Sequence, residues 1–202
     1  MNFNELTPAT IIQRIEGQNE LPPLNRYQEF APSLKLKKAA VLVPMFKQND
    51  DWHLLYIRRS AVQDDFHSGQ IAFPGGAMEE LDANLEETAV RETFEEIGLL
   101  PEKTEILGRL RNHITISSFI LTPIVAIIPK KNEFKLSKQE VDRVFSIPLN
   151  WLVDQKNNYL KERKINNNAS IQVRYFKKYD GEILWGATAR ITLEFISNLL
   201  QI

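Results

Sequence analysis

The sequence predicts an α/β or α+β fold, a sandwich in which helices cover a mixed β-sheet. Short apolar runs bounded by turn residues are interleaved with one internal and one C-terminal amphipathic helix. Apolar residues make up 43% of the 202 residues, the share of an ordinary globular chain and too high for a disordered one. This length suits one domain with extensions, or at most two small domains.

The N-terminal region is predicted to form a short helix followed by a linker. Thr7 and Pro8 have the residue types of a helix N-cap and a first helical position. Residues 18–35 are rich in proline and polar groups, which indicates an extended segment lying on the domain. We therefore expect residues 1–36 to pack against a main domain that spans residues 37–202.

The next segment indicates a β-hairpin and a short third strand. Ala39–Phe46 and Trp52–Arg58 are β-type apolar runs separated by the turn cluster Gln48–Asp51. Ile71–Phe73 is a further short strand that stops at Pro74-Gly75-Gly76.

An internal helix is predicted to begin after Asn84 and to end at Ile97. Glu87 stands three residues after the Asn84 N-cap, which forms a capping box, and Gly98 is a C-terminal cap. The apolar side chains expected to bury against the sheet are Val90, Phe94 and Ile97.

The rest of the chain is expected to alternate between strands, loops and a final helix. Ile106–Ile128 contains two or three strands, Ser137–Val144 is a candidate helical segment, and the Asn-rich stretch Lys156–Asn168 is a loop. Asp180–Gly181 is a strong hairpin signal between Gln172–Tyr179 and Glu182–Trp185. A helix at Ala187–Leu200 closes the fold, with Ile191, Phe195 and Leu199 spaced by four.

Composition excludes several functional classes. Lys and Arg number 25 against 26 Asp and Glu, a balance that argues against nucleic acid or an anionic membrane as partner. Without cysteine the chain has no disulfide, zinc–thiolate site or thiol nucleophile. No signal peptide is recognisable, and the longest apolar run, Ile120–Ile128, is far short of the ~20 residues of a membrane span. We expect a cytoplasmic protein.

Three carboxylates crowd one side of the predicted internal helix. At about 100° per residue, Glu92 and Glu96 fall within about 40° of each other, and Glu95 lies at a similar offset on the other side of Glu92. Like charges four residues apart repel each other. Either this is a solvated acidic face, or the oxygens hold a hard divalent cation such as Mg²⁺ or Mn²⁺.

The stretch Arg91–Leu99 reads R-E-T-F-E-E-I-G-L. It resembles the second half of the Nudix box, G-x5-E-x7-R-E-U-x-E-E-x-G-U, and departs from it only at Thr93. Gly76 precedes the stretch by fifteen residues instead of fourteen, so Asp82 is the acid nearest to the first box glutamate. The resemblance implies a Nudix-type α/β/α sandwich with a catalytic loop–helix–loop at about 75–99.

The wider resemblance is to the coenzyme A pyrophosphatases among the Nudix hydrolases. The one-residue expansion is characteristic of that group, and Arg59-Ser60 followed by the run Gly69–Gly76, G-Q-I-A-F-P-G-G, is similar to its signature. Asp64 or Asp65 stands where the signature has a second arginine. The resemblance covers roughly residues 38–200, and its downstream parts are Ile120–Val125, Glu140–Leu149 and Ile183–Arg190.

The resemblance implies roles for the acids and for the loop glycines. Glu92 and Glu96 are the implied primary metal ligands, Glu95 a further or water-mediated one. Backbone carbonyls near Gly76 would complete the shell, and with Gly75 this turn would meet the substrate. A bound cation would offset the repulsion between these acids and a diphosphate.

Arginines near the turn are assigned by position. Arg91 is expected to pair with a loop acid, either Asp82 or Glu79, and to point away from the Glu92 side. Arg58 and Arg59 alternate between the two faces of their strand, so one of them is expected to contact phosphate, and the resemblance favours Arg59.

Four further side chains have two interpretations each. Glu140 is a candidate general base or a helix N-terminal acid, and His67 is a candidate substrate contact in the signature loop or a histidine without a role. His113 is either a phosphate contact or a loop histidine without a role. Trp185 either stacks on an adenine ring or belongs to the core.

Three functions are compatible with these residues. The first is a Mg²⁺- or Mn²⁺-dependent hydrolase that splits coenzyme A or acyl-CoA into 3′,5′-ADP and (acyl-)4′-phosphopantetheine. The second is the same chemistry on ADP-ribose or another nucleoside diphosphate conjugate. The third is a non-catalytic nucleotide-binding module. The expected partner is a small diphosphate, with no nucleic acid and no membrane, and a homodimer stays open.

Overall fold

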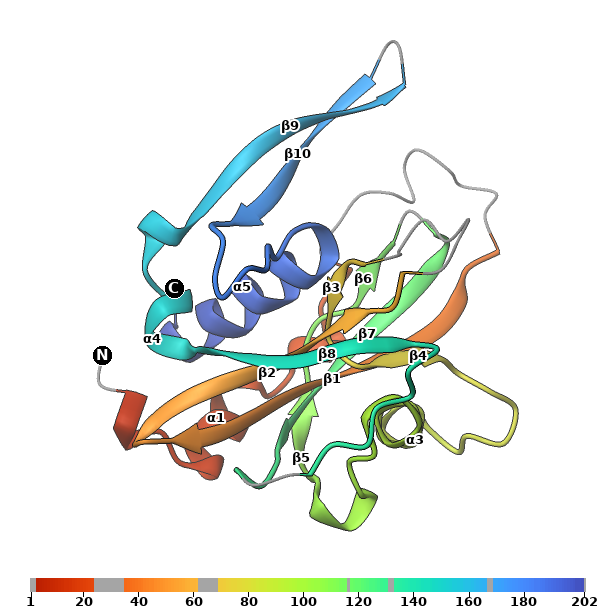
Figure 1. Ribbon diagram of the computed structural model, residues 1–202, viewed down its shortest axis with the longest axis vertical. Coiled ribbons are helices and arrows are strands. Elements are labelled where there is room, and N and C mark those ends of the chain that lie inside the picture. Colours follow the sequence, from red (N-terminus) through yellow and green to blue (C-terminus); the bar gives the residue numbers. More distant parts are fainter. Residues whose placement is uncertain are drawn as a thin grey trace.

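The computed structural model describes residues 3–23, 35–61, 69–115, 117–130, 133–166 and 169–201. In this part of the chain a mixed sheet of eight strands has the order β3-β2-β1-β7-β5, with β4 paired to β1, β6 to β7 and β8 to β2 (Figure 1). The bounds are β1 Lys37–Gln48, β2 Asp51–Arg59, β3 Ile71–Ala72, β4 Gly75–Ala77, β5 Glu105–Arg109, β6 His113–Ile114, β7 Phe119–Ile127 and β8 Val141–Pro148.

Helices cover both faces of this sheet. Helix α3, Leu85–Ile97, lies on one face, while α1, Pro8–Ile15, and α5, Gly186–Leu200, lie on the other (Figure 1). The predicted mixed-sheet sandwich is therefore confirmed. The short elements are α4 Leu149–Leu152 and the 3-10 turns η1 Phe3–Glu5, η2 Gln18–Glu20, η3 Pro101–Lys103 and η4 Gln155–Asn157.

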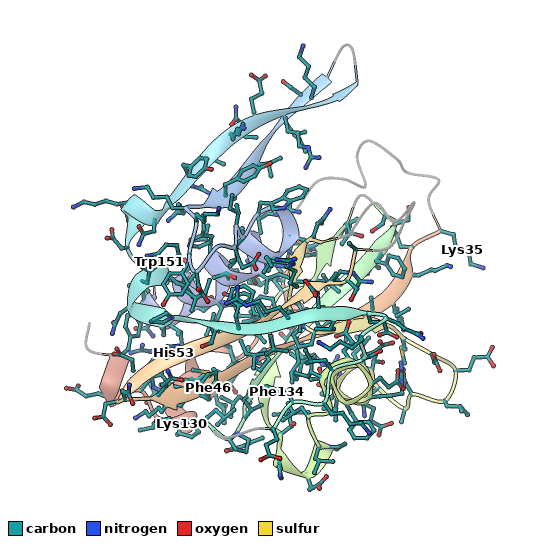
Figure 2. The ribbon with its side chains drawn as sticks, in the orientation of Figure 1. Lys35, Phe46, His53, Lys130, Phe134 and Trp151 are labelled. Atoms are coloured by element: carbon teal, nitrogen blue, oxygen red, sulfur yellow. The ribbon has the colours of Figure 1, made fainter. Side chains whose placement is uncertain are left out.

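Each face has its own apolar core. The core under α5 and α1 includes Tyr56 and Phe195 and also receives Ile11 and Ile15, so the N-terminal helix is part of the same packing unit. The core under α3 includes Leu42 and Ile57, and Phe134 packs against it beside the helix (Figure 2). Because strand side chains alternate between faces, β1 and β2 supply both cores.

The β1–β2 hairpin is confirmed. Met45 to Gln48 pair antiparallel with Asp51 to Leu54, and Asn49 and Asp50 at the turn both have positive φ, as a tight two-residue turn requires. Beyond the hairpin β1 diverges from β2, and β4 pairs with Ala39–Val41. This insertion brings Gly75 and Gly76 next to the middle of the sheet.

The expected helical segment at Ser137–Val144 is wrong, because residues from Val141 onward form strand β8. Val141 and Ile147 have no exposed surface, and the strand pairs with β2 from His53 to Arg59. The backbone hydrogen bonds between β8 and β2 outweigh a weak local helix signal.

The expected loop at Lys156–Asn168 is also wrong. Strand β9, Asn158–Asn166, pairs with β10, Ala169–Phe176, as a two-stranded ribbon that stands beyond α5 in Figure 1. The polar composition misled the prediction because the side chains of Tyr159–Lys164 in β9 are exposed, and cross-strand contacts such as Tyr159 stacked on Tyr175 hold the ribbon together.

The remaining predicted elements are found with small changes. Three strands occupy the Ile106–Ile128 region, and α5 begins one residue before the predicted start. Asp180 and Gly181 form a left-handed turn, but the segment after it makes only isolated bridges, Tyr179 to Glu182 and Tyr175 to Trp185. Within the described ranges, no helix has the length and apolar character needed to cross a membrane.

Candidate active site

The two ends of α3 are set by its caps. The side-chain oxygen of Asn84 accepts a 2.9 Å hydrogen bond from the amide of Glu87, and Oε2 of Glu87 accepts one from the amide of Ala83. At the other end Gly98 adopts φ 71°, and its amide donates to the carbonyl of Phe94. The predicted start and end of this helix are therefore confirmed.

The predicted burial of α3 is partly wrong. Ile97 is buried, but Val90 is only half-buried and Phe94 is 46% exposed. Ala89, Thr93 and Glu96 face the sheet instead. The hydroxyl of Thr93 donates to the carbonyl of Ala89 at 2.6 Å, which satisfies it inside the protein.

Glu96 is therefore a buried carboxylate and not part of an exposed stripe. It is 2% exposed, and its Oε2 accepts a 2.9 Å hydrogen bond from the amide of Gly75. Nη1 of Arg59 lies 3.8 Å from its Oε1. Burial raises the pKa of Glu96 to about 8, with Glu92 and Glu140 adding to the rise and Gly75 and Arg59 opposing it.

Glu92 lies directly against the glycine turn. A Cβ atom added to Gly76 would stand 2.4 Å from the carboxyl carbon of Glu92, so any larger residue would displace this side chain. Gly75 has φ 145°, and a Cβ there would meet the carbonyl oxygen of Ala40 at 2.3 Å. Burial raises the pKa of Glu92 as well. Both glycines are needed for the close approach of backbone and acid.

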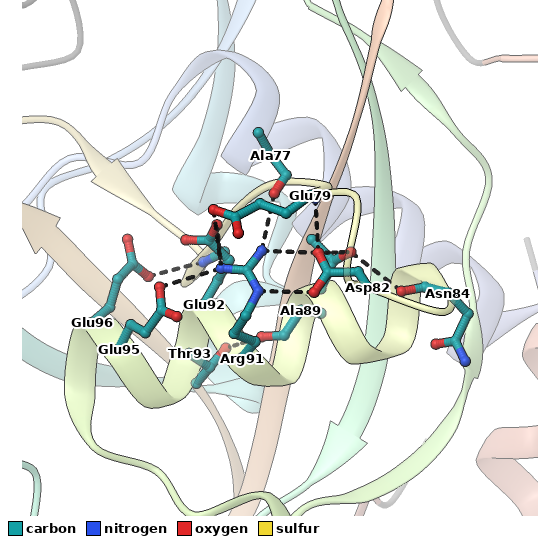
Figure 3. A network of polar contacts seen from close by, with 12 residues as sticks. Ala77, Glu79, Asp82, Asn84, Ala89, Arg91, Glu92, Thr93, Glu95 and Glu96 are labelled. Carbon is teal, nitrogen blue, oxygen red and sulfur yellow. Dashed lines mark hydrogen bonds and ion pairs between the residues drawn. The ribbon is translucent and has the colours of Figure 1, made fainter.

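Arg91 ties the loop before α3 to the helix (Figure 3). Its Nε donates to Oδ1 of Asp82 at 2.8 Å, and its Nη2 donates to Oδ2 of Asp82 at 2.9 Å and to the carbonyl of Ala77 at 3.2 Å. Hydrogen bonds from Arg91 hold the pKa of Asp82 well below its usual range. The predicted pairing of Arg91 with a loop acid is confirmed, with Asp82 as the close partner and Glu79 at 4.0 Å.

The expectation that Arg91 points away from the helix acids is wrong. Its Nη1 contacts Oε1 of Glu92 at 3.1 Å and Oε2 of Glu95 at 3.2 Å (Figure 3). A long arginine side chain spans the offset between neighbouring helix positions, which an angular projection of the helix ignores. Arg91 thereby offsets part of the repulsion between the two glutamates.

The acids form an oxygen-rich set around the turn without converging on one point. Among the described residues no three acidic or histidine side chains stand in a preformed metal cluster. The Gly75 amide holds Glu96. Arg91 holds both Glu92 and Glu95, and the side chain of Glu95 is half exposed. Two desolvated carboxylates beside a glycine backbone nevertheless have the donor chemistry that suits a hard divalent cation.

The two strand-end arginines face different surroundings. Arg58 is engaged by Asp142 at 2.8 Å and by Glu182 at 3.3 Å, while Arg59 lies beside Glu96. The structure thus brings Arg59, and not Arg58, to the acidic turn.

Glu140 also belongs to the surroundings of the turn. It precedes β8 instead of starting a helix, and its backbone carbonyl accepts a hydrogen bond from the amide of Ser60 at 2.8 Å. Its negative charge contributes to the raised pKa of both Glu92 and Glu96. The carboxylate is therefore within electrostatic range of both.

The other candidate residues lie apart from these acids or outside the described ranges. His67, Asp64 and Asp65 lie outside the described ranges. His113 is no loop histidine: it is buried in β6, and its Nε2 lies 2.6 Å from Oε2 of Glu194. Trp185 is half-buried and stacks on Tyr175.

The His113–Glu194 pair was missed by the sequence analysis. Glu194 lies in α5, 81 positions from His113 along the chain, and no local sequence pattern signals a contact over that separation.

Comparisons with known proteins identify the family of the chain. The sequence model of the NUDIX domain matches residues 36–169. An uncharacterized Nudix hydrolase NudL of Enterobacter is 33% identical over 177 residues, covering 85% of this chain and 90% of that one. The protein of the same name from Cronobacter sakazakii is 34% identical with the same coverage.

One solved structure supports the fold over nearly the whole chain. A MutT/nudix family protein from Enterococcus faecalis superposes with a TM-score of 0.51 and 15% identity, covering 99% of this chain and 73% of that one. The chain belongs to the Nudix hydrolase family, the pyrophosphatases that act on diphosphate bonds of nucleoside diphosphate derivatives.

Proposed function

We propose that this protein is a Mg²⁺- or Mn²⁺-dependent pyrophosphatase of coenzyme A or acyl-CoA, which releases 3′,5′-ADP and (acyl-)4′-phosphopantetheine in the cytoplasm. The observation that carries the reaction class is the burial of Glu96 against the Gly75 amide, with Glu92 against Gly76. Two desolvated acids with raised pKa values are costly to keep unless a cation offsets their charge.

Glu92 and Glu96 would hold the cation, with Glu95 as a further or water-mediated ligand and backbone carbonyls near Gly76 as neutral ones. When bound, a divalent cation supplies a water of lowered pKa and neutralises phosphate charge. Glu95 is the most exposed of the three acids, which suits a ligand that acts through water.

The chain's own residues would position the diphosphate and move a proton. Arg59 projects from the end of β2 beside Glu96, where its guanidinium can donate to a phosphate oxygen. Glu140 would take the proton of the attacking water, since its charge already acts on Glu92 and Glu96. His67 would contact the substrate from the signature loop.

The coenzyme A assignment is supported by the stretch Gly69–Gly76 and the pair Arg59-Ser60, which resemble the signature of that group. The acid at Asp64 or Asp65, in place of an arginine, favours a second candidate substrate class that lacks the third phosphate, such as ADP-ribose. Loss of one positive contact matters more to a ligand with three phosphates than to one with two.

The product spectrum decides between these substrates. Purified protein is given coenzyme A, acetyl-CoA or ADP-ribose, with Mg²⁺, with Mn²⁺ or with a chelator, and the products are separated by chromatography. We expect 3′,5′-ADP from coenzyme A only when a divalent ion is present. Strong cleavage of ADP-ribose with intact coenzyme A would replace the first substrate by the second.

A variant pair separates catalysis from mere binding. Glu96→Gln should lower turnover by at least several hundred-fold, while Glu102→Gln changes an exposed acid in η3 and should leave turnover unchanged. A protein that binds these diphosphates yet cleaves none of them under any metal condition would be a non-catalytic nucleotide-binding module. The elution volume of the same samples on size exclusion tests the homodimer.

A further inference from the structure

A second polar site lies on the opposite side of the sheet from Glu92 and Glu96. A pocket of about 470 Å³ is lined by residues of α5, β10, the η2 turn and the connection between β5 and β6. In Figure 1, α5 lies between the main sheet and the β9–β10 ribbon, whereas α3 lies beneath the sheet. The pocket therefore belongs to a different layer of the fold.

Three arginine side chains line this pocket. They belong to Arg111, Arg174 and Arg190, and they come from three separate parts of the chain. Among the described lining residues the only acid is Glu194. Arg111 and Arg174 alone bring two like charges to the lining, and an anion in the pocket would offset their repulsion.

Glu194 is already committed to other groups. Its Oε2 lies 2.6 Å from Nε2 of the buried His113, and its Oε1 accepts a 3.0 Å hydrogen bond from the backbone amide of Arg111. Arg174 donates to a neutral acceptor, Oδ1 of Asn158, at 3.0 Å. Within the described part of the chain, neither the guanidinium of Arg111 nor that of Arg174 is paired with a carboxylate.

Two donors of the pocket lack acceptors within the described part of the chain. Nε of Arg111 and Nδ2 of Asn198 are buried atoms without a hydrogen-bond partner there. A buried N–H group without an acceptor costs free energy comparable to a lost hydrogen bond. An anion with several oxygens in the pocket would offset the charges of Arg111 and Arg174, the arginine to which one of these donors belongs and its neighbour in the lining.

Phosphate has the matching chemistry. Its oxygens accept bidentate hydrogen bonds from guanidinium groups, and its double charge exceeds that of a carboxylate. The pocket is also lined by Leu21 and Leu193, which would contact an apolar part of the same ligand. We propose that this pocket binds the phosphate group of a small anion, as a site separate from the catalytic acids.

Binding in the absence of metal tests the proposal and does not depend on the proposed reaction. Wild-type protein in a chelator is titrated calorimetrically with inorganic pyrophosphate and, separately, with adenosine 3′,5′-bisphosphate. Without cations the acids of the α3 site repel both probes. We expect saturable binding, and Arg111→Gln and Arg174→Gln should each weaken it about tenfold or more, as for loss of a charge-assisted hydrogen bond.

Two controls locate the binding. Arg143→Gln removes an arginine that pairs with Asp180 and Glu182 outside the pocket, and it should leave the affinity unchanged. Arg59→Gln alters the α3 site and should also leave it unchanged. Arg111→Lys keeps the positive charge, so it should retain more affinity than Arg111→Gln. The Tm of each variant is measured without ligand, so that a folding defect can be distinguished from a loss of binding.

The outcomes decide between the proposal and its rejection. Tighter binding of the bisphosphate than of pyrophosphate would support the proposal with an organic phosphate as ligand, and equal or weaker binding would support it with an inorganic one. Absence of saturable binding of both probes would overturn it. So would binding that resists both pocket substitutions or that disappears with Arg59→Gln.

Discussion

The amide of Gly75 donates a 2.9 Å hydrogen bond to Oε2 of Glu96, and this contact joins the turn of β4 to the buried side of α3. It fixes the orientation of a carboxylate that is 2% exposed. One backbone donor does not cover the cost of dehydrating the charged form, and so burial raises the pKa of Glu96 to about 8.

Glu96→Gln should lower kcat by at least several hundred-fold, or about 3–4 kcal/mol of barrier, because the amide is a poor ligand for the cation. The measurement is steady-state turnover of the substrate identified by the product panel, with Glu102→Gln as the matched exposed control. Turnover of the variant at the wild-type level would contradict the proposed metal role of Glu96.

The same substitution should stabilise the metal-free protein at alkaline pH. A folded pKa raised from 4.5 to about 8 favours the protonated carboxyl, so wild-type stability falls as pH rises through this window. Gln cannot ionise, and Glu96→Gln should therefore gain roughly 2–4 kcal/mol over wild type at pH 9 and less at pH 5. Urea unfolding at both pH values in chelator tests this, and a gain independent of pH would contradict it.

Gly76→Ala should reduce kcat by about a hundredfold, because its Cβ would stand 2.4 Å from the Glu92 carboxyl carbon and displace that side chain. The neighbouring exposed Ala77→Ser is the control, since its side chain meets solvent. Circular dichroism confirms folding of both variants. Equal activity of Gly76→Ala and wild type would mean that Glu92 does not need its present position.

Asp82→Asn should lower the free energy of unfolding by about 2–3 kcal/mol at pH 7, since it breaks a two-point ion pair with Arg91. The depressed pKa of Asp82 means that this stabilisation is present above pH about 4 and is lost as pH falls below it. The difference in stability between wild type and variant should therefore shrink steadily as pH falls below 4 toward the depressed pKa. Urea titrations at pH 7 and at low pH check this, and a constant difference would contradict it.

Arg59→Ala should weaken turnover by about tenfold or more, as for loss of a charge-assisted contact to phosphate. Arg58→Ala is the matched control. It should lower the stability of the fold, because the ion pairs with Asp142 and Glu182 are lost, and should leave turnover unchanged. The pair is compared by kcat/KM and by Tm. The reverse pattern would place Arg58 at the phosphate instead.

Divalent ions should bind to the protein with release of a proton below pH 8, because the raised pKa of Glu96 keeps its carboxyl protonated there. Calorimetry of Mn²⁺ binding in two buffers of different ionisation enthalpy counts the protons, and Glu96→Gln should remove the release. If neither Mg²⁺ nor Mn²⁺ binds, even with a diphosphate present, the acids of α3 are only a structural and solvated group.

Local chemistry along the chain determines several features of this protein without help from distant contacts. The caps Asn84 and Gly98 delimit α3 because they satisfy its terminal backbone groups, and the turn cluster at Gln48–Asp51 specifies the β1–β2 hairpin. The spacing of Glu92, Glu95 and Glu96 within this helix puts them on one side of it, because the angle between helix positions follows from the sequence alone.

Only the tertiary structure decided which of these acids are buried. Glu96 faces the sheet and Phe94 faces solvent, the reverse of what polarity suggests, because β4 inserts beside β1 and supplies the Gly75 amide. Strand β8 and the β9–β10 ribbon likewise depend on pairing that the local sequence signal does not reveal. Strand pairing and burial depend on contacts between segments that are distant in the sequence, so no local sequence pattern predicts them.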